Sequence, residues 1–177
     1  MTRVMGADLS SRSMAFALLD TNTGLVVTKK ASVLNTIMNR HRIINLLSNE
    51  VEVWLRESQA DALYIEEPLV AGARNLQSSL KIAQVAGALL CLSAGMEQVY
   101  LVPVATWKKD VIGHGGAVKS EVCSWVAEHH PQVAAVCGLD QDLYDAAAIA
   151  FYGQGCLRRS GQLSGGLCEQ PSAATVA

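Results

Sequence analysis

The stretch VMGADLSSRSMAFALLD, residues 4–20, determines the fold class. Its apolar residues follow a period of two on either side of the small polar residues after Asp8, as in two strands joined by a tight turn. The turn-rich DTNTG, residues 20–24, and a third apolar run, LVVTKKASV, come directly after it. These runs predict two hairpins, and therefore three antiparallel strands, between residues 3 and 31.

Helices and further strands alternate after this N-terminal part. Apolar residues at helical spacing, with turn and stop signals between them, predict helices over residues 36–59, 76–95, 119–129 and 141–152. The short apolar runs ADALYIEEP and QVYLVPV predict two more strands, and Pro131 is expected to end the third helix. This order is typical of an α/β domain of the ribonuclease H type: a mixed five-stranded sheet, its first three strands antiparallel, flanked by helices.

Length and composition limit the domain organisation. The chain has 177 residues, of which 50% are apolar and 17% charged, which suits one domain with a real hydrophobic core. We expect this domain to span residues 1–153. The Gly-, Ser- and Ala-containing residues 154–177 lack periodicity and are expected to form a flexible tail.

Other compositional features exclude several classes of protein. No apolar run reaches the roughly 18 residues that a membrane helix needs, and no signal-peptide pattern is present, so we expect a soluble cytoplasmic protein without a membrane partner. The five cysteines are scattered without a CxxC pair, which signals neither a disulfide framework nor structural zinc. The net charge of −2 means that any binding of nucleic acid must rest on a local basic patch.

Acidic residues from distant segments are expected at one edge of the sheet. Asp8 ends the first strand, Glu66 and Glu67 end the fourth, and Asp142 and Asp145 share one face of the last helix. Carboxylates so close repel one another unless cations neutralise them, and Mg²⁺ or Mn²⁺ prefer oxygen ligands. Two such ions roughly 3.5–4 Å apart can activate a water and stabilise the leaving oxygen of a phosphodiester. We therefore predict a nuclease in which about four of these carboxylates hold two ions.

Each of these acids alone has a structural alternative. Asp8 could accept hydrogen bonds from backbone N–H groups of the turn, and Asp140 or Asp142 could cap the last helix. Glu67 could be a solvated charge at the end of a strand. Their joint placement favours the metal site, because helix capping does not explain acids at the ends of two strands.

The segment WKKDVIGHGGAVKSEV, residues 107–122, is basic and rich in glycine. It is not a phosphate-binding P-loop, because Val118 precedes Lys119 where that motif requires glycine. The glycines can let the backbone approach a phosphate, and Lys119 at the start of a helix brings a cation to the same place. Although each basic group alone could be a solvated charge, we predict DNA contacts for Lys108, Lys109, Lys119, Arg74 and His114.

With these residues assembled, the chain resembles the RuvC family of Holliday junction resolvases. The resemblance covers residues 3–153 and rests on four segments in the family's order: GADLSSRSMAFALLD, LYIEEPLVAGARNLQSSLKIAQVAGAL, WKKDVIGHGGAVKSEV and DLYDAAAIAFYG. It implies a homodimer that uses Mg²⁺ or Mn²⁺ to cut two strands of a four-way or branched DNA symmetrically in recombination, repair or replication. It also implies that the catalytic residues and metal ligands are Asp8, Glu66, Asp142 and Asp145. Lys119 would then contact the scissile phosphate or the attacking water, and Lys108 would be a second basic position.

The chain departs from the family pattern at three places. Leu9-Ser10 follows Asp8 where the family usually has Pro-Gly, and Glu67 stands where glutamine is common. Leu69 replaces an aromatic residue that stacks on a base, a contact worth roughly 1–3 kcal/mol. These departures suggest a broader branched-DNA endonuclease that also acts on forks and flaps, which would suit a bacteriophage enzyme.

Three alternative functions share this architecture. The sugar-kinase and actin group needs a second nucleotide-binding half, for which 177 residues leave no room. A catalytically silent nucleic-acid-binding module is disfavoured by the complete acidic set. An RNA-processing nuclease of the same fold is the nearest alternative, and the apolar helix and the Lys119 segment favour the resolvase-like interpretation over it.

Overall fold

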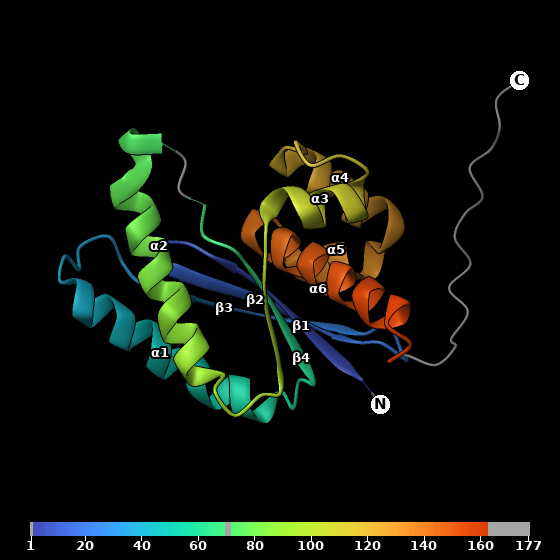
Figure 1. The fold of residues 1–177 in the computed structure, drawn as a ribbon, viewed down its shortest axis with the longest axis horizontal. Helices are drawn as coiled ribbons and strands as arrows, with labels where there is room; N and C mark the ends of the chain where they lie inside the picture. The colour runs from blue at the N-terminus through green and yellow to red at the C-terminus, as the bar shows by residue number, and fades with distance from the viewer. Residues whose placement is uncertain (1, 70–71, 163–177) are drawn as a thin grey trace, which may run out of the picture.

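A computed structural model describes residues 2–69 and 72–162 of the chain, with only the backbone described for residues 72–75. Its centre is a mixed five-stranded sheet with strand order β3-β2-β1-β4-β5 (Figure 1). The first three strands are antiparallel neighbours, and β4 and β5 join them in parallel. The predicted fold class is therefore confirmed. The strands are β1 (Arg3–Leu9), β2 (Ser13–Asp20), β3 (Val26–Ser32), β4 (Ala62–Glu66) and β5 (Gln98–Val102).

Helices cover both faces of the sheet (Figure 1). The first two pack on one face around Met5, Phe16 and Leu63, and the later helices pack on the other face around Val4 and Ala15. The protein is thus a three-layer α/β domain with two separate apolar cores. The helices are α1 (Arg40–Glu57), α2 (Gly72–Leu92), α3 (Val104–Ile112), α4 (Lys119–His129), α5 (Pro131–Cys137) and α6 (Gln141–Arg159). No helix among those described is both long and apolar enough to cross a membrane.

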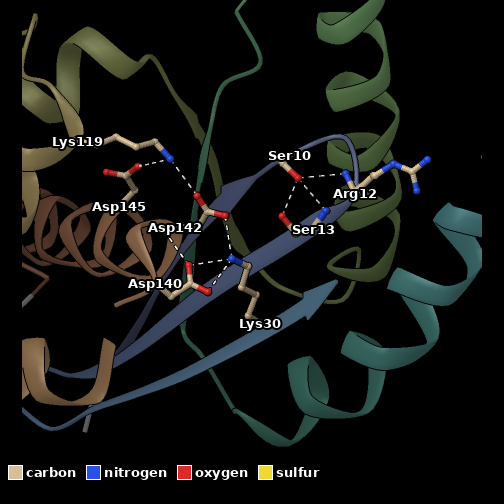
Figure 2. Close-up of polar contacts among 8 residues, drawn as sticks. All are labelled: Ser10, Arg12, Ser13, Lys30, Lys119, Asp140, Asp142 and Asp145. Atoms are coloured by element: carbon tan, nitrogen blue, oxygen red, sulfur yellow. Dashed lines mark hydrogen bonds and ion pairs between the residues drawn. The ribbon is translucent and has the colours of Figure 1, made fainter. Parts of the chain in front are cut away.

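The turn between β1 and β2 is built by serine side chains. The Oγ of Ser10 accepts hydrogen bonds from the backbone N–H groups of Arg12 and Ser13, at 3.1 and 2.9 Å, and bonds the Ser13 hydroxyl (Figure 2). A hydroxyl bonded to backbone groups two and three residues ahead stabilises a tight turn. Serine therefore provides the turn here without the Pro-Gly pair of the family pattern.

Helix boundaries differ from the sequence prediction at several points. The first helix starts at Arg40 rather than residue 36, because the Asn39 side chain accepts a hydrogen bond from the Arg42 N–H and caps it. Helix α2 begins at Gly72 rather than residue 76. Helix α3 was not predicted; it lies between Pro103 and Gly113, whose φ of 106° ends it. Pro131 does not merely end a helix but occupies the first turn of α5, where its missing N–H costs nothing.

The last helix is longer than predicted, because its glycines serve packing and do not break the helix. A Cβ on Gly153 would lie 2.5 Å from the Tyr64 ring and 2.8 Å from Val4, so only glycine lets α6 lie this close to the sheet. The helix continues to Arg159. Residues 154–159, expected to be tail, are therefore helical, and residues 163–177 of that predicted tail lie outside the described residues.

Candidate active site

The sheet brings Asp8 and Glu66 to the same edge. Strands β1 and β4 are parallel, and their register ends with Ala7 paired to Ile65, so the next residues along the two strands are Asp8 and Glu66. Parallel strands end at a common edge of the sheet, which places both carboxylates side by side there. The convergence predicted from the strand ends is therefore present.

Close packing of α6 on β1 adds the third carboxylate. A Cβ on Gly6 would lie 2.1 Å from the Ala146 carbonyl oxygen and 2.4 Å from the Ala150 nitrogen, so the helix backbone rests almost directly on the strand. Asp145 precedes this contact and is buried. The alanine run after Asp145 thus acts as predicted: it packs tightly and holds that carboxylate near Asp8.

Burial and mutual repulsion make these charges costly. Burial, followed by repulsion from Glu66, Asp145 and Asp142, raises the pKa of Asp8 well above its usual range. Burial likewise raises the pKa of Glu66 and of Asp145, although hydrogen bonds and nearby lysines offset part of the effect. The folded protein therefore stores unfavourable charge at this edge, which a bound cation would relieve.

Lys119 directly contacts the acidic cluster, which consists of Asp8, Glu66, Asp142 and Asp145. It is the first residue of α4, and its Nζ lies 3.0 Å from Oδ1 of Asp142 and 3.6 Å from Oδ2 of Asp145 (Figure 2). Burial lowers the pKa of the Lys119 ammonium, but the hydrogen bond to Asp142 and the surrounding carboxylates outweigh burial and raise it. Lys119 thus begins a helix, as predicted, and its contact with a phosphate stays a prediction.

A second lysine, Lys30 on β3, was missed. Its Nζ donates to both oxygens of Asp140, at 2.8 and 2.7 Å, and to Oδ2 of Asp142 at 2.9 Å (Figure 2). Although burial alone would raise the pKa of Asp142, the hydrogen bonds from Lys30 and Lys119 lower it. A lysine in an edge strand carries no sequence signal for such a role, because only the register of β3 shows which of Lys29 and Lys30 faces α6.

Asp140 has the structural role that the sequence left open. One of its side-chain oxygens accepts a hydrogen bond from the Asp142 N–H at 3.1 Å, so Asp140 caps α6. The same carboxylate pairs with Lys30. This cap fixes the start of the helix on which Asp142 and Asp145 lie.

Trp107 on α3 was also missed as a residue of the site. It is fully buried, and its Nε1–H donates a hydrogen bond of 3.1 Å to Oε2 of Glu66. The ammonium of the next residue, Lys108, lies 5.4 Å from the centre of the Trp107 ring and donates to the Ala117 carbonyl at 2.7 Å. Lys108 therefore connects α3 to the loop before Lys119.

The remaining predicted DNA contacts lie on or near the glycine-rich segment. Lys109 is exposed on α3. The Nε2 of His114 lies 3.4 Å from Oε1 of Glu121, whose other oxygen accepts the Val118 N–H and caps α4. Arg74 lies in the first turn of α2, where side chains are outside the described residues. Contacts of these groups with DNA remain predictions.

The donor set suits a hard divalent cation. The Asp145 side chain is only 8% exposed, and its Oδ1 is buried without a hydrogen-bond partner among the described residues. An unpartnered carboxylate oxygen beside two further carboxylates of raised pKa is the arrangement that an oxygen-preferring ion satisfies. Within residues 2–69 and 72–162, no three His, Cys, Asp or Glu side chains are arranged as a group that could hold a metal ion. The positive charge beside Asp142 comes instead from the Lys119 ammonium.

Comparisons with solved structures agree with this architecture. Thermus thermophilus RuvC in complex with Holliday junction substrate superposes with a TM-score of 0.70 at 20% identity, over 90% of this chain and 97% of that chain. A second structure of RuvC from Thermus thermophilus matches with a TM-score of 0.66 at 21% identity, over the same shares. These likenesses establish a common fold. Comparison with curated protein sequences gives no match.

The sequence itself carries the family pattern. The model of the family described as crossover junction endodeoxyribonuclease RuvC matches residues 4–152, a segment that includes every acidic residue of the cluster. Because this match spans most of the chain and agrees with the fold, the chain belongs to the RuvC family.

Proposed function

We propose that this protein is a metal-dependent endonuclease that cuts Holliday junctions and other branched DNA in recombination, repair or replication. The observation that carries the proposal is the buried, unpartnered Oδ1 of Asp145 beside Asp8 and Glu66. Membership of the RuvC family supports DNA as the substrate. The Thermus thermophilus relative in complex with Holliday junction substrate supports a branched DNA in particular.

The acidic cluster would hold Mg²⁺ or Mn²⁺, with two ions per site. Asp8, Glu66 and Asp145 would hold one ion, and Asp142 would contribute to the second. Such ions supply positive charge and an activated water when bound. Hydrolysis with the 3′ oxygen as leaving group gives a 5′-phosphate and a 3′-hydroxyl.

The chain's own lysine would orient the phosphate. Lys119 begins α4, and about half of its side chain is exposed, at 51%. Its ammonium can therefore turn from Asp142 toward a phosphate oxygen without leaving the site. Lys119 is also the first residue of α4, and exposed N–H groups at a helix start favour an anion. We propose that Lys108, Lys109, Arg74 and His114 extend this contact along the DNA.

We propose further that the active form is a homodimer paired through α2. Exposed or partly exposed small and apolar residues recur on this helix at spacings of four and three residues, a pattern typical of a helix–helix seam. A second copy of the same helix is the partner that such a self-complementary stripe fits, and two-fold pairing presents two active sites to two strands. The stripe consists of Leu76, Leu80, Ala83, Gly87 and Leu90.

A cleavage assay tests this function. End-labelled four-way junction, fork, flap, linear duplex and structured RNA are incubated with the protein in Mg²⁺ or Mn²⁺, with the Asp8→Asn variant as control. We expect paired symmetric nicks in the junction and none with the variant. Cleavage of RNA alone would replace this function by RNA processing, and no cleavage of any substrate would indicate a nucleic-acid-binding module.

A further inference from the structure

Lys30 belongs to the same row of the sheet as Asp8. The register pairs Asp8 with Ala15 on β2, and Ala15 with Lys30 on β3, so these three residues lie in line across three strands. Residues opposite one another in neighbouring strands project to the same face. Ala15 is fully buried and small, so the row between the acid and the lysine holds no bulky side chain. Lys30 is thus part of the active-site face.

Among the four predicted metal ligands, Asp142 is the residue for which ammonium partners are described at both carboxylate oxygens. Lys30 donates to Oδ2 at 2.9 Å, and Lys119 donates to Oδ1 at 3.0 Å. Asp145, in contrast, keeps Oδ1 without a hydrogen-bond partner in the part of the chain that the structure describes. An incoming cation therefore finds an unsatisfied oxygen at Asp145 but must compete with two lysines at Asp142.

The two lysines are not held equally. Lys30 extends from a strand, its side chain is 26% exposed, and it also bonds both oxygens of Asp140. Lys119 is 51% exposed and makes one hydrogen bond to the cluster. The Lys119 ammonium can leave the cluster toward solvent, whereas Lys30 stays in place through Asp140. The ammonium group that stays beside Asp142 is therefore that of Lys30.

We propose that Lys30 is a positioning residue that makes the two cation positions of this site unequal. The position formed by Asp8, Glu66 and Asp145 binds the first divalent ion tightly. The position at Asp142 binds a second ion weakly in the free protein, because Lys30 already neutralises that carboxylate. This inference rests on the proposed metal-dependent function and assigns Lys30 a role within it.

Bound DNA would then strengthen the binding of the second ion at Asp142. A DNA phosphate placed at the site adds negative charge beside Asp142 and attracts Lys119 away from it. A group that strengthens the binding of an ion must itself be bound more strongly when that ion is present. Lys30 therefore makes loading of the second ion depend on a bound phosphate.

Titration of Mn²⁺ into the DNA-free protein, followed by electron paramagnetic resonance of free Mn²⁺ and by calorimetry, tests the proposal without any activity measurement. Wild type is expected to bind one ion tightly and a second weakly. In Lys30→Met the second ion should bind on the order of tenfold more tightly, because a unit charge a few ångströms from a divalent ion has been removed. Lys30→Arg, which retains the charge, should behave as wild type.

Lys29→Met is the matched control. It removes the same charge one residue away, but Lys29 pairs with Glu50 of α1 on the other face of the sheet, at 3.6 Å. We expect no change in either Mn²⁺ affinity. If the methionine at position 30 prevents folding, as judged by circular dichroism, Lys30→Gln retains hydrogen bonding without the charge and should show the same gain.

The outcomes separate this inference from the function on which it rests. A wild type that binds no Mn²⁺ would overturn the metal site, and the role of Lys30 with it. Wild-type binding that is unchanged in folded Lys30→Met or Lys30→Gln, or changed equally in Lys29→Met, would overturn the role of Lys30 alone.

Discussion

The indole N–H of Trp107 donates a hydrogen bond of 3.1 Å to Oε2 of Glu66, and the ring is completely buried. A tryptophan from α3 thus fixes one oxygen of a carboxylate at the end of β4, and leaves the other for a ligand. Groups that orient a metal ligand in this way typically contribute 10- to 100-fold to metal affinity or activity.

Trp107→Phe is therefore expected to weaken the site while keeping the fold. The phenyl ring fills most of the space but donates no hydrogen bond, so Glu66 loses its fixed orientation. We expect DNA cleavage and Mn²⁺ affinity to fall by about 10- to 100-fold. Trp54→Phe, on α1 beside Phe16 on the opposite face of the sheet, is the control and should leave both unchanged. Equal effects of the two variants would show that Trp107 acts only through packing.

Asp8→Asn is expected to abolish cleavage and yet stabilise the metal-free protein. Burial and neighbouring carboxylates raise the pKa of Asp8 in the folded state, so its charged form opposes folding above that pKa. In EDTA near pH 7 to 8, the variant should melt at a higher temperature than wild type. The difference should shrink as pH falls and Asp8 becomes protonated, and vanish near the unfolded carboxyl pKa of about 4.

Thermal melts from pH 4 to 8, with and without Mg²⁺, measure this effect. Mg²⁺ should raise the melting temperature of wild type more than that of the variant, because only wild type has the complete ligand set. A variant that is less stable than wild type at every pH would show that the Asp8 charge supports the fold and does not strain it.

The sheet and most of the acidic cluster could be predicted from the sequence, because those features follow local rules. Alternating apolar residues predict strands, and strand ends place Asp8 and Glu66 at an edge. It did not reveal Lys30 or Trp107, whose roles depend on strand register and on the position of a helix that was not predicted. The extension of α6 was missed because Gly153 indicates a helix end locally, whereas contact with Tyr64 requires glycine there.

Gly6→Ala is expected to disturb the whole site through one methyl group. The added Cβ would lie 2.1 Å from the Ala146 carbonyl oxygen, which is backbone and cannot turn aside, so α6 must move away from β1. Overpacking of this kind costs about 1–3 kcal/mol or more. Asp145 moves with the helix, so cleavage should fall more than stability alone explains.

Chemical denaturation and cleavage at a temperature where both proteins are folded check this prediction. Gly95→Ala is the control, because a Cβ there meets nothing within 4 Å. It should leave stability and cleavage close to wild type. A Gly6→Ala protein with wild-type stability would mean that the close approach of α6 to β1 is not required.

Leu80→Glu is expected to separate the proposed dimer. Leu80 is 49% exposed in the middle of the α2 stripe, so a charge there costs the monomer little but would be buried against its copy in a dimer. Sedimentation should show wild type as a dimer at micromolar concentration and the variant as a monomer. The control is Leu34→Glu, at a residue that is 74% exposed in the loop after β3, and it should remain dimeric.

The monomeric Leu80→Glu protein should retain Mn²⁺ binding, because the acidic cluster lies within one chain, but should lose the paired symmetric cuts in a junction. A wild type that is monomeric at every concentration, or a Leu80→Glu protein that is still dimeric, would exclude α2 as the interface.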